Sequence, residues 1–268
     1  MAPRARPDAA AAAHRAAAQV ASVLLLATLG EPAGSRVCDC LNWKQVYGEG
    51  LAECGEGAEL FHFLARAGVS ARDARWIQRE NPAWASICTE FFTKLDTDRC
   101  VNVAVHPHGR AGLPGSSWCY VSSDCRSLNG GSPLADTYSF FGLGGRAVSW
   151  KRCARGADPL LADMPPGDLL ELASQLNMSS LWASRLAYVQ YPGLWHEVEW
   201  SWREGDPEIM PAELRAALRK EEAAVVDEFP SGHHRILFGR DEWINYLDSV
   251  CDPPRGACWK KRPDGSLA

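Results

Sequence analysis

The segment Trp118-Cys119-Tyr120-Val121-Ser122-Ser123-Asp124-Cys125 joins a short apolar strand pattern to two closely spaced cysteines. It belongs to a cluster, because eight of the ten cysteines fall between Cys38 and Cys153 and the next 97 residues contain none. An even number of clustered cysteines behind an apolar leader is typical of a disulfide framework. The sequence therefore predicts a disulfide-stapled protein. The bridging residues are expected to be Cys38, Cys40, Cys54, Cys88, Cys100, Cys119, Cys125, Cys153, Cys251 and Cys258.

A structural zinc site and reduced structural thiols are the alternatives to disulfides. Zinc motifs use Cys-x2-Cys knuckles, or a cysteine pair followed by a histidine pair. The short spacings here are one intervening residue after Cys38, five after Cys119 and six after Cys251, and none of them is a zinc knuckle. We therefore expect disulfides, with no metal and no cofactor. Cys251 is expected to pair with Cys258 because the two are isolated, whereas the pairing of the other eight stays open.

Residues 1–35 have the features of a secretory signal peptide. Three arginines lie in an alanine-rich start, and an apolar run over residues 16–30 follows. A basic region followed by an apolar run that is shorter than a membrane span is typical of such signals, and we expect cleavage near Ser35. An uncleaved signal anchor and an organellar transit segment are the alternatives. The mature chain is expected to be secreted or to enter an organelle lumen, without a membrane span.

The composition favours some partners over others. A formal net charge of −5 lacks the basic footprint of a protein that binds nucleic acid, and the basic run Lys260-Lys261-Arg262 is expected to be a solvated tail. Eleven tryptophans are many for 268 residues. Tryptophan fills the cores of small disulfide domains and also forms contact surfaces for sugars and proteins. A protein or a glycan is therefore the expected partner.

The hydrophobic pattern predicts an α+β fold with two modules after the leader. Residues 36–157 are expected to form a cysteine-rich module of helices and short strands, and residues 158–268 a smaller α+β module with a C-terminal cysteine pair. Apolar residues at steps of three and four predict helices, and alternation predicts strands. The expected helices are residues 59–67, 70–80, 84–95, 169–176, 181–189, 211–227 and 241–250. The expected strands are residues 101–105, 118–121, 195–202 and 235–238.

A second pattern combines Trp118-Cys119-Tyr120-Val121 with Cys125 and with Trp150-Lys151-Arg152-Cys153. It resembles the end of a kringle or fibronectin type II module, in which such a strand and a later Trp-x-x-Cys are stapled together. The earlier cysteine spacings and the three expected helices before it depart from those modules, so no ligand-binding residue is carried over. The chain also resembles uncharacterised cysteine-rich secreted proteins of algal protists, a likeness that implies no particular activity.

Three further groups of residues are candidates for chemistry. On the expected strand, Glu197 and Glu199 would share one face about 7 Å apart, and glycosidases place two carboxylates across the scissile bond. Outward carboxylates on a strand are, however, usually just solvated. Asn177 begins a glycosylation sequon, Asn-Met-Ser. His106 and His108 flank a proline and have no evident third metal ligand, so we expect a plain loop there.

The sequence contains no nucleophile elbow, phosphate-binding loop, dinucleotide fingerprint or calcium loop. We therefore expect a secreted or lumenal disulfide-rich protein that binds a protein or a glycan and has no catalysis of its own. One alternative is a secreted glycosidase-like hydrolase that uses the carboxylates of Glu197 and Glu199. Another is a structural component of a wall, a matrix or a lumenal complex.

Overall fold

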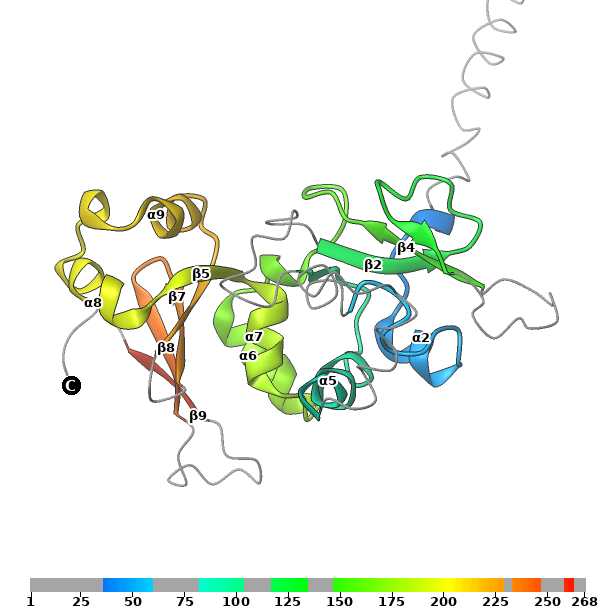
Figure 1. The fold of residues 1–268 in the computed structure, drawn as a ribbon, viewed down its shortest axis with the longest axis horizontal. Coiled ribbons are helices and arrows are strands. Elements are labelled where there is room, and N and C mark those ends of the chain that lie inside the picture. The colour runs from blue at the N-terminus through cyan, green and yellow to red at the C-terminus, as the bar shows by residue number, and fades with distance from the viewer. Residues whose placement is uncertain are drawn as a thin grey trace, which may run out of the picture. The chain divides into compact units, whose positions relative to one another are not determined.

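The computed structural model of the chain describes residues 36–59, 82–103, 117–134, 147–228, 233–246 and 258–262. These residues form short helices and two β-sheets (Figure 1). The expected α+β class, with disulfides in the N-terminal part, is therefore confirmed. Among the described helices, none has the length and apolar character that crossing a bilayer requires.

The first sheet is built on the cysteine-bearing segment that follows Ser117. β2 pairs antiparallel with both β1 and β4, and β3 pairs antiparallel with β4, which gives the order β1-β2-β4-β3. The bounds are β1 Val101–Asn102, β2 Ser117–Ser122, β3 Ser132–Pro133 and β4 Val148–Arg152. The expected strand at residues 118–121 is confirmed. Residues 104 and 105 of the other expected strand lie outside the described residues.

Short helices pack beside this sheet. The bounds are η1 Arg36–Cys38, α2 Trp43–Gly48 and α5 Pro82–Ile87, and α5 continues as one π-helical turn over Cys88–Phe92. α2 begins after Asn42, whose side-chain oxygen accepts a hydrogen bond from the Gln45 N–H at 3.2 Å. The apolar stripe expected over residues 84–95 is confirmed, because Ile87, Phe91 and Leu95 are all buried. The helices expected within residues 60–80 lie outside the described residues.

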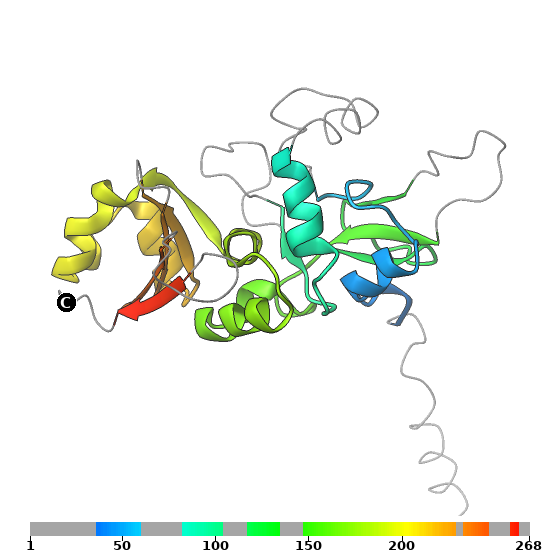
Figure 2. The ribbon, with the colours of Figure 1, turned by 90° about the horizontal axis from the view of Figure 1, so that it is seen from below.

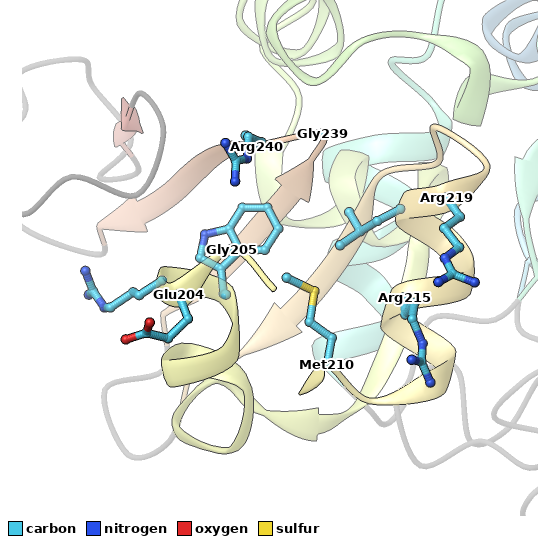
Figure 3. A pocket seen from close by; sticks show the side chains of 10 residues that line it. Glu204, Gly205, Met210, Arg215, Arg219, Gly239 and Arg240 are labelled. Carbon is cyan, nitrogen blue, oxygen red and sulfur yellow. The ribbon is translucent and has the colours of Figure 1, made fainter. Parts of the chain in front are cut away.

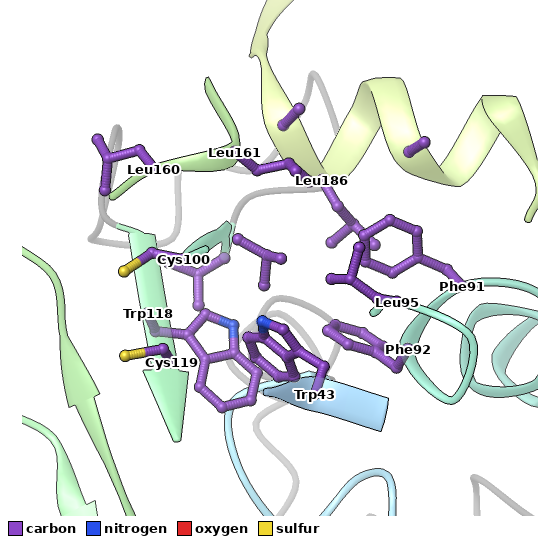
Figure 4. Packing of buried hydrophobic residues seen from close by; sticks show 14 of the residues in the cluster. Trp43, Phe91, Phe92, Leu95, Cys100, Trp118, Cys119, Leu160, Leu161 and Leu186 are labelled. Carbon is purple, nitrogen blue, oxygen red and sulfur yellow. The ribbon is translucent and has the colours of Figure 1, made fainter. Parts of the chain in front are cut away.

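Aromatic side chains from α2, the π-helical turn and β2 form the centre of the first core (Figure 4). The Trp43 ring meets the Trp118 ring edge-on, with 4.8 Å between their centroids, and lies 5.3 Å from the Phe92 ring. Such pairs contribute about 0.5–1.5 kcal/mol beyond the burial of their area. Leu161 and Leu186 belong to the same core. The core therefore includes residues from both sides of the module boundary expected near residue 157.

Four disulfides cross-link this part of the chain. The pairs are Cys38–Cys125, Cys40–Cys119, Cys54–Cys88 and Cys100–Cys153. Each bridge restricts the unfolded chain and typically contributes about 2–4 kcal/mol. They are compatible with a secreted or lumenal disulfide-rich protein. Cys251 lies outside the described residues, so its pairing with Cys258 stays a prediction.

Two helices lead from the first sheet to the second. The bounds are η3 Leu161–Asp163, α6 Pro166–Gln175 and α7 Ser180–Ala187. Both α-helices were expected from sequence and are confirmed. Ser179 caps α7, since its hydroxyl accepts from the Trp182 N–H at 3.4 Å. The Asn102 side chain on β1 donates to the Tyr188 carbonyl at 3.2 Å, which joins the end of α7 to the first sheet.

The second sheet has the strand order β5-β6-β7-β8-β9, in which β5 and β6 are parallel and the other pairs are antiparallel. The bounds are β5 Val189–Leu194, β6 Ala224–Asp227, β7 His234–Phe238, β8 Asp241–Tyr246 and β9 Cys258–Arg262. The strand expected at residues 235–238 is confirmed. Figure 2 shows β9, in red, along one edge of this sheet.

Three expectations in this region are wrong. The helix expected over residues 211–227 ends early, as α9 Ala212–Arg219, because Glu221 has a left-handed φ of 56° and β6 begins soon afterwards. The helix expected from Asp241 is β8, which lies between β7 and β9. Successive strand residues face opposite sides of a sheet, so the consecutive burial of Trp243 and Ile244 means that both faces of the sheet are covered there. A run of this kind does not distinguish a buried strand from a helix. The expected basic tail forms β9.

The strand expected over residues 195–202 is also wrong, because this segment is helix α8, Trp195–Glu204. Its buried residues Trp195, Val198 and Trp202 recur at helical spacing on one face. Trp200, which a strand would place on one face with Val198 and Trp202, is 66% exposed. α8 ends at Gly205, whose left-handed φ of 68° suits a residue without a Cβ.

Candidate functional site

A pocket of about 430 Å³ opens beside the second sheet. It lies between the end of α8, the 3-10 turn η4 Pro207–Ile209, the helix α9 and the turn from β7 to β8. Its charged lining is mostly basic and comprises Arg203, Arg215, Arg219, Arg240 and Glu204. Figure 3 shows Arg215 and Arg219 on α9, on the other side of the Met210 side chain from Glu204 and Arg240.

The floor of this pocket is apolar. Trp202 and Met210 are buried, and Leu218 is partly buried against them. All three belong to the core that α8 and α9 form with the second sheet, so the floor is rigidly packed. The Trp202 Nε1–H is a buried donor with no hydrogen-bond partner among the described residues. The floor therefore presents an apolar surface to the pocket, and the Trp202 donor is enclosed beneath it.

Two carboxylates neutralise part of the basic lining. Glu199 accepts hydrogen bonds from Nε and Nη2 of Arg203 at 2.9 and 2.6 Å, one helical turn away on α8. Glu208 binds two arginines at once, because Arg215 Nη1 and Arg219 Nη2 approach its two oxygens at 2.9 and 2.6 Å. The single negative charge of Glu208 is therefore shared by two positive guanidinium groups on α9.

Arg240 has no ion pair within the described ranges, and it is exposed. Its guanidinium lies over Gly205 at the end of α8. Together with Glu204, the carboxylates of Glu199 and Glu208 supply three negative charges against four guanidinium groups. The pocket is therefore positive on a chain that is acidic overall, and it favours a ligand with an acidic group.

Two large apolar side chains beside the pocket are exposed to solvent. Trp200 is 66% exposed and stands three and four residues before Arg203 and Glu204, so it neighbours them on α8. Ile209, in η4, is 42% exposed and precedes the floor residue Met210. Tryptophan and arginine are the residues most enriched at the centres of protein interfaces.

A buried carboxyl group lies in the first core. Glu59 is 2% exposed, and its Oε1 accepts hydrogen bonds from the hydroxyls of Tyr47 and Tyr120 at 2.7 and 2.5 Å. Burial raises the pKa of Glu59 above its usual value, although the two tyrosine hydroxyls act in the opposite direction. The pKa values of both tyrosines are raised, first by burial and then by the Glu59 charge. Because the group is closed off from solvent, its role is to hold α2 against β2.

A buried serine–histidine pair joins α7 to β7. The Ser184 Oγ lies 3.4 Å from the His234 Nε2, and burial lowers the pKa of His234 to about 3, with Arg185 and His233 adding to the effect. The Ser184 hydroxyl donates to the Leu181 carbonyl at 2.9 Å. Its proton therefore points away from the imidazole, and both side chains are buried. This arrangement does not activate a nucleophile.

The structure places the sequence-predicted residues apart from one another. Glu197 and Glu199 lie on a helix, where residues two apart point in different directions. Glu197 accepts from the Leu194 N–H at 3.0 Å at the start of α8, and Glu199 binds Arg203. Asn177 is exposed in the turn between α6 and α7, a position open to glycosylation. His106 and His108 lie outside the described residues.

No residue pattern in the sequence predicted the pocket. Its residues come from two segments, 202–219 and 239–240, that meet only because β5, β6 and β7 bring them together. The only sequence feature that could have indicated the pocket is the group of arginines after residue 200, namely Arg203, Arg215 and Arg219. Among the described residues, four sulfur atoms lie close enough to hold one metal ion, those of Cys40, Cys100, Cys119 and Cys153. Comparison of the chain with protein-family models, with curated proteins and with solved structures found no match.

Proposed function

We propose that the protein is a secreted or lumenal binding protein, without catalysis of its own, that captures an acidic, partly apolar segment of another protein in the pocket beside α8 and α9. The observation that carries this proposal is the excess of guanidinium groups over carboxylates above an apolar floor. Arginine forks bind carboxylates with two parallel hydrogen bonds, which gives both affinity and orientation.

The surroundings of the pocket favour a protein over a glycan. A sugar platform needs an exposed aromatic face inside the site, whereas Trp202 is buried in the floor. Met210 and Leu218 instead offer an apolar surface that fits aliphatic side chains. The exposed Trp200 and Ile209 extend the same surface beyond the pocket and supply anchors for a longer peptide segment.

The disulfide framework supports the compartment. Bridges of this number form and persist in oxidising environments, and the exposed sequon at Asn177 is accessible there to glycosylation. A signal peptide over residues 1–35 would deliver the chain to that environment.

A peptide-display selection on the purified oxidised chain tests the proposal. We expect enrichment of sequences that place aspartate or glutamate next to leucine, methionine or phenylalanine. Arg240→Gln and Trp200→Ala should each abolish most of this enrichment. Arg155→Gln is the matched control, because Arg155 is also exposed but binds Glu222 away from the pocket. Absence of enrichment, or equal enrichment on all four proteins, would overturn the proposal.

A further inference from the structure

Two disulfides lie against each other at one end of the first sheet. The Sγ atoms of Cys40 and Cys100 belong to different bridges and are 3.3 Å apart. With those of Cys119 and Cys153, the four sulfur atoms all lie within 4.8 Å of one another. Cys100 and Cys119 are buried, and the other two are partly buried. The four residues therefore form a single compact sulfur cluster.

Backbone hydrogen bonds at or beside Cys153, Cys100 and Cys40, and the pairing of β2 with β4 around Cys119, do not involve the bridges. The Cys153 N–H donates to the Ser117 carbonyl at 2.8 Å, and the Cys100 N–H donates to the Pro159 carbonyl at 2.8 Å. Next to Cys40, the Leu41 N–H donates to the Tyr120 carbonyl at 2.8 Å. Since these bonds do not depend on the oxidation state of sulfur, the thiols should stay close together after reduction.

The cluster has the donors and the dimensions of a tetrathiolate metal site. Zinc binds four thiolates at about 2.3 Å in a tetrahedron, which places the sulfur atoms about 3.8 Å apart. Sulfur atoms within 4.8 Å of one another reach that arrangement by small side-chain rotations. Lys151 lies opposite Cys119 in the β2–β4 pair, and its Nζ is bound to Asp158 Oδ1 at 2.6 Å, so the four sulfur atoms are the metal donors of this site.

We propose that Cys40, Cys100, Cys119 and Cys153 are a redox-dependent metal site that forms two disulfides when oxidised and binds one Zn²⁺ when reduced. A dithiol reductant transfers two electrons to each bridge, which yields four protein thiols and two molecules of oxidised reductant. Zinc then forms four Zn–S bonds, and the four thiol protons are released to solvent. The site is independent of the arginine-lined pocket and would hold the sheet together before the bridges form.

Cobalt titration of the fully reduced chain tests this site, because tetrahedral Co²⁺ bound to thiolates has strong and characteristic visible absorption. We expect one Co²⁺ per chain with the spectrum of four sulfur ligands, and its displacement by Zn²⁺. Alkylation of the zinc-loaded chain followed by mass spectrometry should then find Cys40, Cys100, Cys119 and Cys153 protected. The remaining six cysteines should react.

Paired variants separate the site from general effects on folding. Cys54→Ser with Cys88→Ser removes a bridge outside the cluster and should leave cobalt binding intact. Cys153→Ser should change the spectrum to that of three sulfur ligands, a shift that a merely unfolded chain would not produce. The proposal is overturned if the reduced wild-type chain binds no cobalt, or if zinc protects the ten cysteines equally.

Discussion

The guanidinium of Arg240 lies so close to the backbone of Gly205 that a Cβ at position 205 would stand 2.7 Å from the Arg240 Nη2. Gly205 ends α8 with a φ of 68°, and Arg240 is the last residue of the turn between β7 and β8. Because Gly205 has no side chain, the Arg240 guanidinium can lie at this position in the pocket. Among the described residues, Arg240 has no ion pair.

Gly205→Ala should therefore impair both stability and binding. A left-handed backbone at a residue with a Cβ costs about 1 kcal/mol, and the displaced Arg240 should bind an acidic peptide more weakly. Gly50→Ala is the matched control, because Gly50 has the same φ of 68° and nothing within 4 Å of its added Cβ. Urea unfolding should show similar losses for both variants, and calorimetry should show weaker binding for Gly205→Ala alone. Unchanged binding by Gly205→Ala would contradict this assignment.

Glu59 should make the fold less stable as pH rises. Its pKa in the folded chain is raised by burial, so the folded state holds the proton more tightly than the unfolded state does. The free energy of unfolding should fall, by at most about 1.4 kcal/mol per pH unit, between the usual pKa of a glutamate and the raised value. Urea unfolding measured across this range should show the fall. It should vanish in Glu59→Gln and persist in the control Glu171→Gln, and a wild-type profile retained by Glu59→Gln would refute the assignment.

His234 should act in the opposite direction. Burial lowers its pKa to about 3, so between the usual value for histidine and that value the unfolded state binds a proton that the folded state does not. This contribution to the free energy of unfolding is complete above the usual pKa of histidine. It is lost as pH falls below that pKa, at up to about 1.4 kcal/mol per pH unit. His234→Gln should flatten this loss in urea unfolding, whereas His196→Gln, at an exposed position on α8, should retain it. Equal behaviour of the two variants would count against the assignment.

The disulfide pattern is checked by a non-reducing peptide map of the purified chain. We expect four linked peptide pairs, Cys38 with Cys125, Cys40 with Cys119, Cys54 with Cys88 and Cys100 with Cys153. The same map reports the N-terminus and the occupancy of Asn177. Linkage of Cys40 to Cys100, or free thiols among these eight residues, would contradict the pattern.

Local patterns were sufficient to predict the first core. The segment from Trp118 to Val121 is a central strand with a run of buried residues, and the stripe from Ile87 to Leu95 follows one helical face. In both places the spacing of apolar residues and the tertiary burial agree, so the local signal and the fold give the same answer.

Two elements were assigned the wrong period. In α8, apolar residues at positions 195, 198, 200 and 202 fit alternation almost as well as helical spacing, and only the exposure of Trp200 distinguishes the two. In β8, the consecutive residues Trp243 and Ile244 face opposite sides of the sheet and are both buried. The resulting run of apolar residues is a pattern shared with buried helices. Neither the exposure of Trp200 nor the burial of both faces of β8 can be read from the local sequence.

The two candidate sites depend on contacts that span the chain. The sulfur cluster unites residues 40, 100, 119 and 153, whose spacings match no short metal motif. The pocket joins α8 and α9 to a turn some twenty residues beyond α9. Sequence therefore indicated the residue types, and only the paired strands show which of them meet.

Calorimetric titration with two blocked peptides tests the binding function most directly. One peptide alternates glutamate with leucine, and the other has glutamine in place of each glutamate. We expect the oxidised chain to bind the glutamate peptide, with affinity that falls as salt rises, and to bind the glutamine peptide at least about tenfold more weakly because a charge-assisted hydrogen bond is lost. Arg240→Gln should remove most of that preference, and Arg155→Gln should keep it. Equal affinity for the two peptides, or equal losses in the two variants, would contradict the proposed function.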